Sequence, residues 1–184
     1  DGGATHHRDL WFRFWIWYQP GWNGGGGNKI ARLFSFASPD HWGQAMIAHL
    51  WSGGAGDRQL VLDPARGTDD AGRLVTTRYN DFANLRWLGA VQAGPVFDGR
   101  KEGRWTCLEA RVRLNTPGQR DGRFEVWVDG TRAGGRTDLD WMGVFGPWGL
   151  NAFYLENFWN DGSPAEQARV FDDLVISTAP IGCE

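Results

Sequence analysis

Residues 105–114 read WTCLEARVRL, and this stretch decides the fold. From position 108 onward the even-numbered side chains are apolar and the odd-numbered ones are glutamate or arginine. Because successive side chains of a β-strand point to opposite faces, this alternation predicts a strand with one buried face and one polar face. A turn signal at 115–122 and a second alternating run at 123–129, which ends on Asp-Gly, predict an antiparallel neighbour.

Similar runs extend over most of the chain. Residues 58–62 and 73–79 are expected to pair as a hairpin around an Asp-Pro turn, and 163–166 carries the signature of a single helical turn. About nine short strands without an internal repeat predict an all-β sandwich or barrel that forms one domain over residues 1–184. The remaining predicted strands are 10–18, 29–36, 44–51, 152–159 and 169–177.

Charge and hydropathy exclude two classes of partner. The chain has 184 residues, 19 of them basic and 22 acidic, for a net charge of −3. Nucleic-acid binding needs a clustered basic surface, which this balance does not favour. No run approaches 18 uninterrupted apolar residues, so a membrane span is not expected.

The two cysteines, Cys107 and Cys183, lie far apart in sequence and lack zinc-type spacing. A disulfide between them would fix the C-terminal tail to a strand, and it would indicate a secreted or cell-surface protein. Two unpaired buried thiols are the alternative.

Three segments together resemble a known group of proteins. They are WTCLEARVRLNTPG at 105–118, VWVDG at 126–130 and VFDDLVIS at 170–177. The early Arg13-Phe14 strand and the Asn28-Lys29 step resemble the same group. The group is the polysaccharide-lyase-like branch of the concanavalin A-like jelly rolls, which includes glucuronan, alginate and heparin lyases.

The resemblance implies a two-sheet antiparallel β-jelly-roll sandwich whose concave sheet holds a sugar chain. It also implies β-elimination in which a tyrosine serves as acid or base, while histidine, glutamine or arginine neutralises a uronate carboxylate. In some relatives an aspartate on the last strand binds a structural calcium ion.

Tryptophan is abundant, with twelve residues in the chain. Alternation places Trp15, Trp17, Trp51 and Trp127 opposite rows of core residues. Aromatic rings stack against the apolar face of a pyranose, so this set predicts a polysaccharide-binding strip. The alternative is that a loop or the second sheet covers these rings.

Five polar residues share the Trp-bearing side by the same alternation. They are Arg13, His49, Glu125, Tyr154 and Glu156. With a bound uronan, Arg13 would pair with a carboxylate, Tyr154 would transfer a proton, and His49 would share either role. Glu125 and Glu156 are expected to contact the substrate. Each residue taken singly also fits an ordinary solvated face.

Three functions therefore stay open. The first is a polysaccharide-binding domain of lyase-like fold, either catalytic or not. The second is a structural or adhesive surface module. The third is a glycoside hydrolase, which needs two carboxylates about 5–10 Å apart. The hydrolase would have to form its pair from Glu125 facing Glu109 or Glu156.

Asp172 and Asp173 are adjacent acids on the last predicted strand. A carboxylate beside a packed strand needs a partner. A structural Ca²⁺ ion is one candidate, because it takes oxygen ligands and the resemblance places a calcium-binding aspartate nearby. A salt bridge to one of the many arginines is the other.

Overall fold

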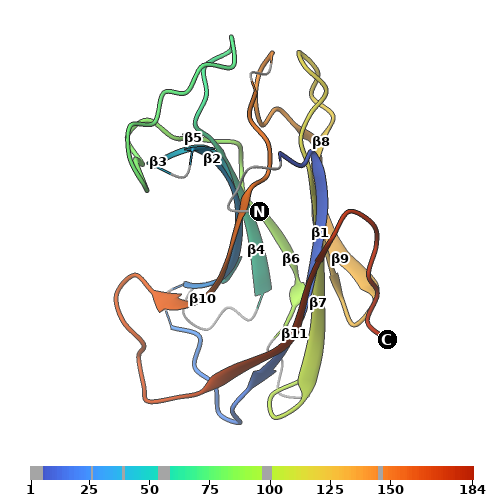
Figure 1. Ribbon diagram of the computed structural model, residues 1–184. Coiled ribbons are helices and arrows are strands. Elements are labelled where there is room, and N and C mark those ends of the chain that lie inside the picture. The colour runs from blue at the N-terminus through green and yellow to red at the C-terminus, as the bar shows by residue number, and fades with distance from the viewer. Residues whose placement is uncertain (1–5, 26, 39, 54–58, 97–100, 145–146) are drawn as a thin grey trace.

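Two antiparallel sheets packed face to face form the protein, as the computed structural model shows in Figure 1. The structure describes residues 6–25, 27–38, 40–53, 59–96, 101–144 and 147–184. Within these ranges no helix is long and apolar enough to cross a membrane. Residues 164–166 form bends in place of the helical turn expected at 163–166.

Strands distant in sequence lie side by side in both sheets, which confirms the predicted jelly-roll sandwich. The five-stranded sheet has the order β11 (Arg169–Ser177), β1 (Asp9–Tyr18), β7 (Trp105–Arg113), β8 (Gly122–Val128) and β9 (Thr131–Leu139). The six-stranded sheet has the order β10 (Ala152–Trp159), β2 (Asn28–Ser38), β3 (His41–Ser52), β4 (Gln59–Arg66) and β5 (Arg86–Trp87), with β6 (Val91–Pro95) also paired to β4.

The core lies between the sheets and follows the predicted alternation. Phe12, Phe14 and Ile16 of β1 are at most 1 % exposed and face the apolar side chains of the other sheet. Leu108 and Val112 of β7 are buried in the same cluster. Burial of such side chains contributes about 1.5–3 kcal/mol each to folding, so these alternating residues hold the two sheets together.

The expected hairpin of 58–62 with 73–79 was wrong. β4 pairs with β3 along one edge and with β5 and β6 along the other, so no edge remains for residues 73–79. These residues lie instead in a loop that is held to the preceding chain by an isolated bridge between Thr68 and Leu74 and by hydrogen bonds such as that from the Thr76 hydroxyl to the Gln44 carbonyl. This loop carries Tyr79 toward the outer face of the six-stranded sheet.

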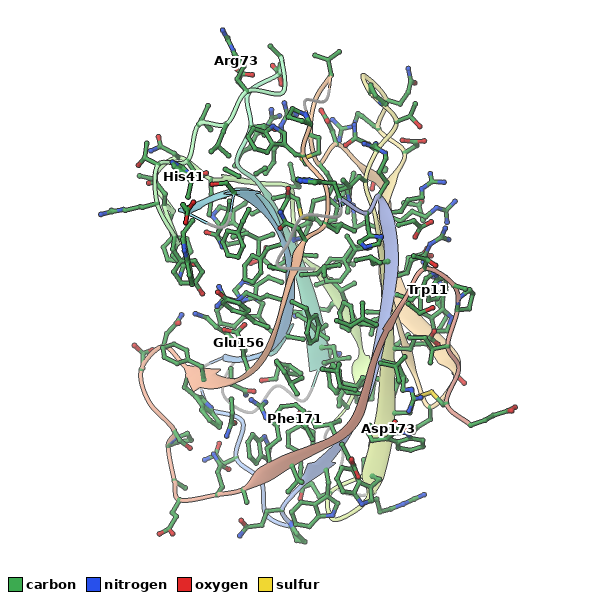
Figure 2. All side chains as sticks on the ribbon, viewed as in Figure 1. Trp11, His41, Arg73, Glu156, Phe171 and Asp173 are labelled. Atoms are coloured by element: carbon green, nitrogen blue, oxygen red, sulfur yellow. A yellow bond between two sulfur atoms is a disulfide. The ribbon has the colours of Figure 1, made fainter. Side chains whose placement is uncertain are left out.

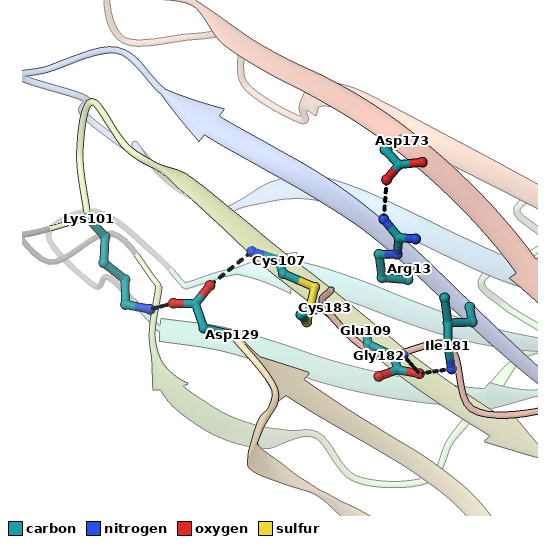
Figure 3. Close-up of a disulfide and its surroundings, with 9 residues drawn as sticks. All are labelled: Arg13, Lys101, Cys107, Glu109, Asp129, Asp173, Ile181, Gly182 and Cys183. Atoms are coloured by element: carbon teal, nitrogen blue, oxygen red, sulfur yellow. Dashed lines mark hydrogen bonds and ion pairs between the residues drawn. A yellow bond between two sulfur atoms is a disulfide. The ribbon is translucent and has the colours of Figure 1, made fainter.

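The C-terminal tail is fixed to the outer face of the five-stranded sheet, as Figure 3 shows. Cys107 and Cys183 form the predicted disulfide. Beside it, the Glu109 carboxylate accepts hydrogen bonds from the backbone N–H groups of Ile181, at 2.8 Å, and Gly182. The tail therefore covers part of this face.

Reducing this disulfide should lower the free energy of unfolding by about 4 kcal/mol, because the bond restricts a long loop in the unfolded chain. The two cysteines are 76 residues apart. Urea unfolding with and without reductant measures the difference. The Cys107→Ser/Cys183→Ser variant serves as control and should not respond to reductant; an equal stability of oxidised and reduced protein would contradict the expectation.

Candidate functional site

The outer face of the six-stranded sheet carries a row of polar residues that crosses four neighbouring strands. Tyr154 of β10 lies opposite Arg32 of β2, Arg32 opposite His49 of β3, and His49 opposite Asp63 of β4. Directly opposed residues of neighbouring strands point to the same face. Figure 1 shows that the sheet bends so that this face is concave.

Two sets of residues, all apolar except Lys29, border the polar row on both sides. Toward one end of the strands lie the opposed residues Ala152, Phe34, Ile47, Ala65 and Trp87; toward the other lie Phe158, Lys29, Trp51 and Val61. We call these two sets the upper row and the lower row. Phe34, Ile47 and Ala65 of the upper row are buried beneath Leu85 and Tyr79 of the 67–85 loop, whereas Phe158 of the lower row is 51 % exposed. The lower row therefore offers an exposed ring beside charged groups, which suits an anionic sugar.

Arg32 is the centre of the polar row and is only 3 % exposed. Its guanidinium holds the Glu156 carboxylate through two hydrogen bonds of 2.5 Å each. It also donates to the Tyr79 hydroxyl and to the Asn80 side-chain oxygen. This two-point pair neutralises a buried charge and fixes the 67–85 loop over the sheet.

Lys29 is a second buried cation, 6 % exposed, and its surroundings differ. Its Nζ lies 4.5 Å from the ring centroid of Phe158 and 5.4 Å from that of Trp51. Among the residues that the structure describes, no carboxylate forms an ion pair with it. Burial lowers the pKa of Lys29, as does nearby Arg32, against the opposing charge of Glu156. Such an ammonium favours an incoming oxyanion.

His49 is 2 % exposed, and neither ring nitrogen has a hydrogen-bond partner within the described parts of the chain. Its ring centroid lies 4.1 Å from that of Trp51. Burial, with the positive charges of Arg32 and Lys29, holds the pKa of His49 well below its usual 6.5. The imidazole is therefore neutral at pH 7 and keeps one nitrogen able to accept a proton.

The pKa of Tyr154 is shifted in the opposite direction to that of His49. Burial raises the pKa of its phenol above the usual 10.0, with a further increase from Tyr79 and an opposing effect of Arg32. Its ring packs edge-on against Phe34, with centroids 4.9 Å apart. The row therefore places a group that keeps its proton, Tyr154, near one that lacks it, His49.

The structure divides the residues selected from the sequence between two opposite faces. His49, Trp51, Tyr154 and Glu156 lie together on the concave face; Arg13, Trp15, Trp17, Trp127 and Glu125 lie on the outer face of the five-stranded sheet. The expectation of one shared face was wrong, because alternation separates core from surface within each strand and a sandwich has two outer surfaces.

The charged residues of the five-stranded face have partners within that face. Arg13 forms an ion pair with Asp173, which Figure 3 shows. Glu125 bonds Arg123 and Arg132. Glu125 and Glu156 belong to different sheets, so they do not face each other.

The contacts at the last strand favour the arginine alternative for Asp173. Its left-handed φ of 51° coincides with a bulge opposite Arg13, and Asp172 accepts a hydrogen bond from its backbone N–H. No cluster of three or more potential metal-ligating side chains occurs in the described ranges. Calcium binding by Asp172 and Asp173 stays a prediction that chelation followed by thermal unfolding would test.

Four residues of the concave face were not selected from the sequence. Lys29, Arg32 and Asp63 are charged residues within otherwise apolar or mixed strands. A charge in such a strand is a sequence signal that could have marked them as candidate site residues. Tyr79 lies in the loop that was wrongly expected to be a strand. Combining these residues required the register of the strands.

Acidification should expose the unusual state of His49. The unfolded imidazole has a pKa near 6.5, so below this pH the unfolded chain binds one more proton than the folded chain, and stability falls as pH decreases. The expected slope is about 1.4 kcal/mol per pH unit until the lowered pKa is reached. Urea unfolding between pH 7 and 5 measures it. His49→Gln should flatten the slope, whereas the exposed His41→Gln should preserve it; equal slopes in all three proteins would contradict this assignment.

No protein-family model and no curated protein sequence matches the chain. Several solved structures do. An alginate lyase from a Chlorella virus shares 15 % identity at a TM-score of 0.65, covering 94 % of this chain and 72 % of that one. An alginate lyase from Aplysia kurodai shares 14 % sequence identity at a TM-score of 0.65, and the match covers 96 % of this chain and 72 % of that one. An endo-β-1,4-glucuronan lyase from Trichoderma reesei shares 12 % sequence identity at a TM-score of 0.59, and the match covers 97 % of this chain and 72 % of that one. The chain therefore has the polysaccharide-lyase-like jelly-roll fold that the sequence predicted.

Proposed function

We propose that the protein binds a uronic-acid-containing polysaccharide across the concave face and cleaves it by β-elimination. The row of Tyr154, Arg32 and His49 beside Lys29 carries this proposal. The named substrates of the similar structures, alginate and glucuronan, are polymers of uronic acids. The Trp-bearing five-stranded face contributes none of these proton-transferring groups.

In β-elimination a base removes the proton from the ring carbon that bears the carboxylate. The bond between the neighbouring ring carbon and the oxygen of the leaving sugar then breaks, and a double bond forms between these two ring carbons. The leaving oxygen takes up a proton. Removing the first proton builds negative charge on the carboxylate, which nearby cations must stabilise. Lys29 has no competing carboxylate partner in the described chain, so it stabilises the charge on the substrate carboxylate, and Arg32 adds a second positive charge nearby.

Proton transfer is assigned from the states of the two remaining groups. Neutral His49 accepts the proton of the ring carbon, and Tyr154 donates its phenolic proton to the leaving oxygen. The lowered pKa of His49 keeps its imidazole neutral, and the raised pKa of Tyr154 keeps its phenol protonated. Their strands are separated by β2, so the backbones lie roughly 10 Å apart, which leaves room for a sugar unit between the side chains.

A non-catalytic binding module is the second candidate. The Glu156 carboxylate already occupies the Arg32 guanidinium, so a substrate carboxylate would have to displace it to use this cation. A glycoside hydrolase has less support. Asp63 and Glu156, the two acids that the described strands place on this face, lie on strands separated by two others. Their backbones are roughly 14 Å apart, whereas hydrolysis needs two carboxylates about 5–10 Å apart.

We also propose that the protein acts outside the cell. The Cys107–Cys183 disulfide persists in oxidising compartments, and a polysaccharide substrate fits the same location.

Ultraviolet absorbance tests the reaction directly, because elimination creates a double bond conjugated to the carboxylate. The purified protein should produce rising absorbance near the ultraviolet cut-off with at least one of a panel of uronans, including glucuronan and alginate. Binding to such a polymer without any rise would leave the non-catalytic module as the function.

A further inference from the structure

We propose that Arg169, the first residue of β11, is a positioning residue that holds Lys29 on the concave face from the core side of the sheet. This inference rests on the proposed function, because Lys29 is the cation assigned there to the substrate carboxylate. Arg169 belongs to the five-stranded sheet, yet its hydrogen bonds reach β2 and β10 of the other sheet. Figure 2 shows both Glu156 of β10 and Phe171 of β11 in the lower half of the sandwich, where Arg169 connects the two sheets.

Arg169 is a buried cation, 7 % exposed, and it forms no ion pair with a carboxylate of the residues that the structure describes. Its guanidinium carbon lies 5.2–5.9 Å from the centroids of four rings of the hydrophobic core, those of Tyr18, Trp22, Trp159 and Phe171. Aromatic rings attract a cation, but a buried charge without an opposite charge is usually less favourable than an apolar side chain of similar size. The guanidinium differs from an apolar side chain in supplying hydrogen-bond donors in fixed directions.

These hydrogen bonds end beside the candidate site. Nη2 of Arg169 donates to the backbone carbonyls of Lys29, at 2.9 Å, and Glu156, at 2.8 Å. Nη1 donates to the side-chain oxygen of Asn28, at 2.6 Å. One guanidinium therefore fixes the backbone at the cation of the lower row and at the acid that pairs with Arg32.

Both carbonyls lie where the pairing of β2 with its neighbours is irregular. On the β3 side the register shifts next to Lys29, and on the β10 side it shifts within residues 155–158, which include Glu156. A bulge disrupts the ladder hydrogen bonds around it, and a buried carbonyl that leaves the ladder needs another donor. Arg169 supplies a donor at each of the two bulges.

The bulge beside Lys29 determines which face of the sheet this side chain points to. Lys29 and Arg32 are an odd number of positions apart, and they share the concave face because the register shifts between them. A shift of one residue sends a side chain to the opposite face of a sheet. Without the guanidinium we expect the backbone to relax here, so that Lys29 leaves its position beside Phe158 and Trp51. Arg169 thus acts on the substrate only through Lys29.

Chemical labelling of lysines tests this positioning without any substrate. Lys29 is 6 % exposed, whereas the side chain of Lys101, the other lysine, is 25 % exposed, so an amine-reactive reagent should label Lys29 of the wild-type protein more slowly. Arg169→Met should raise the labelling rate of Lys29 relative to Lys101 roughly tenfold, because two buried carbonyls lose a donor. Peptide mass spectrometry measures each lysine separately.

Calorimetric titration with glucuronan and alginate oligosaccharides tests whether the effect reaches the substrate. Arg169→Met should weaken binding roughly tenfold or more, as expected for loss of the charged contact made by Lys29. In a Lys29→Met background the same substitution should change the affinity by less than about twofold, because that contact is already absent. Arg169→Lys keeps one donor group, so it should show a smaller loss with the same dependence on Lys29, and it decides the question if Arg169→Met does not fold.

The Cys107→Ser/Cys183→Ser variant is the matched control for a general loss of stability, because its missing disulfide belongs to the outer face of the other sheet. Its lysine labelling and its uronan affinity should equal those of the wild-type protein. Unchanged labelling of Lys29 in the Arg169 variants would overturn the inference, and so would an equal loss of affinity with and without Lys29. If the wild-type protein binds neither uronan, the proposed function fails, and the labelling still decides whether Arg169 holds Lys29 in place.

Discussion

Replacing Tyr154 with phenylalanine should reduce uronan turnover by about 10²–10⁴-fold, the usual contribution of a positioned acid or base. Only the hydroxyl is lost, and the ring that packs on Phe34 remains, so substrate affinity should change little. The loss should therefore appear in kcat, with KM nearly constant. Initial rates of ultraviolet absorbance over a range of uronan concentrations give both values.

Tyr79→Phe is the matched control for this substitution. Its hydroxyl accepts a hydrogen bond from Arg32 and has no role in proton transfer in the proposed reaction. Its removal should have a much smaller effect on kcat. Equal losses in the two variants would show that tyrosine hydroxyls support the face structurally, and unchanged turnover in Tyr154→Phe would remove this residue from the mechanism.

Replacing Lys29 with methionine should weaken the interaction with uronan by roughly ten- to hundredfold, which corresponds to the loss of one charged hydrogen bond of about 1.5–3 kcal/mol. Methionine keeps an apolar stem between Phe158 and Trp51, so the packing of the lower row should persist. Relief of a buried charge should keep the protein at least as stable as wild type. Calorimetric titration with uronan and thermal unfolding measure the two effects.

The chain provides a control, because Lys101 is its only other lysine. Lys101 pairs with Asp129 on the other sheet, away from the concave face. Lys101→Met should bind uronan like wild type. A similar loss of affinity in both lysine variants would indicate general attraction of a polyanion to positive charge, and it would contradict a specific role for Lys29.

The fold could be predicted from the sequence because its signal is local. The alternation in residues 105–114 assigns each side chain of β7 to one of the two faces of its sheet, and the structure agrees, except that the C-terminal tail buries Cys107 and Glu109 on the outer face. The disulfide was also predictable, because the sequence contains only two cysteines.

The site was predictable only in part, because its grouping depends on the pairing of distant strands. Alternation places Tyr154 and His49 on the sides of their strands that face away from the core between the sheets, as the structure does, but it grouped them with Arg13 on the other sheet. Lys29 and Arg32 show a second limit. They differ by an odd number of positions, so simple alternation places them on opposite faces.

A β-bulge explains how Lys29 and Arg32 share the concave face. The register shifts between Lys29 and Ala31, so that Lys29 opposes Trp51 while Arg32 opposes His49. An extra residue in one strand reverses the alternation beyond it. No residue pattern in this strand marks the bulge, so the two buried cations of the site could be brought together only by the structure.

We expect the concave face, and not the Trp-bearing face of the other sheet, to bind the polysaccharide. Affinity electrophoresis in gels containing the uronan that the wild-type protein binds, with Trp51→Ala and Trp127→Ala side by side, tests it most directly. Trp51 contacts His49 and Lys29, whereas Trp127 contacts Trp11 on the five-stranded sheet. With both melting temperatures close to wild type, Trp51→Ala should lose retention and Trp127→Ala should keep it. Loss of retention in Trp127→Ala alone would place binding on the outer face of the five-stranded sheet and would contradict the assignment to the concave face.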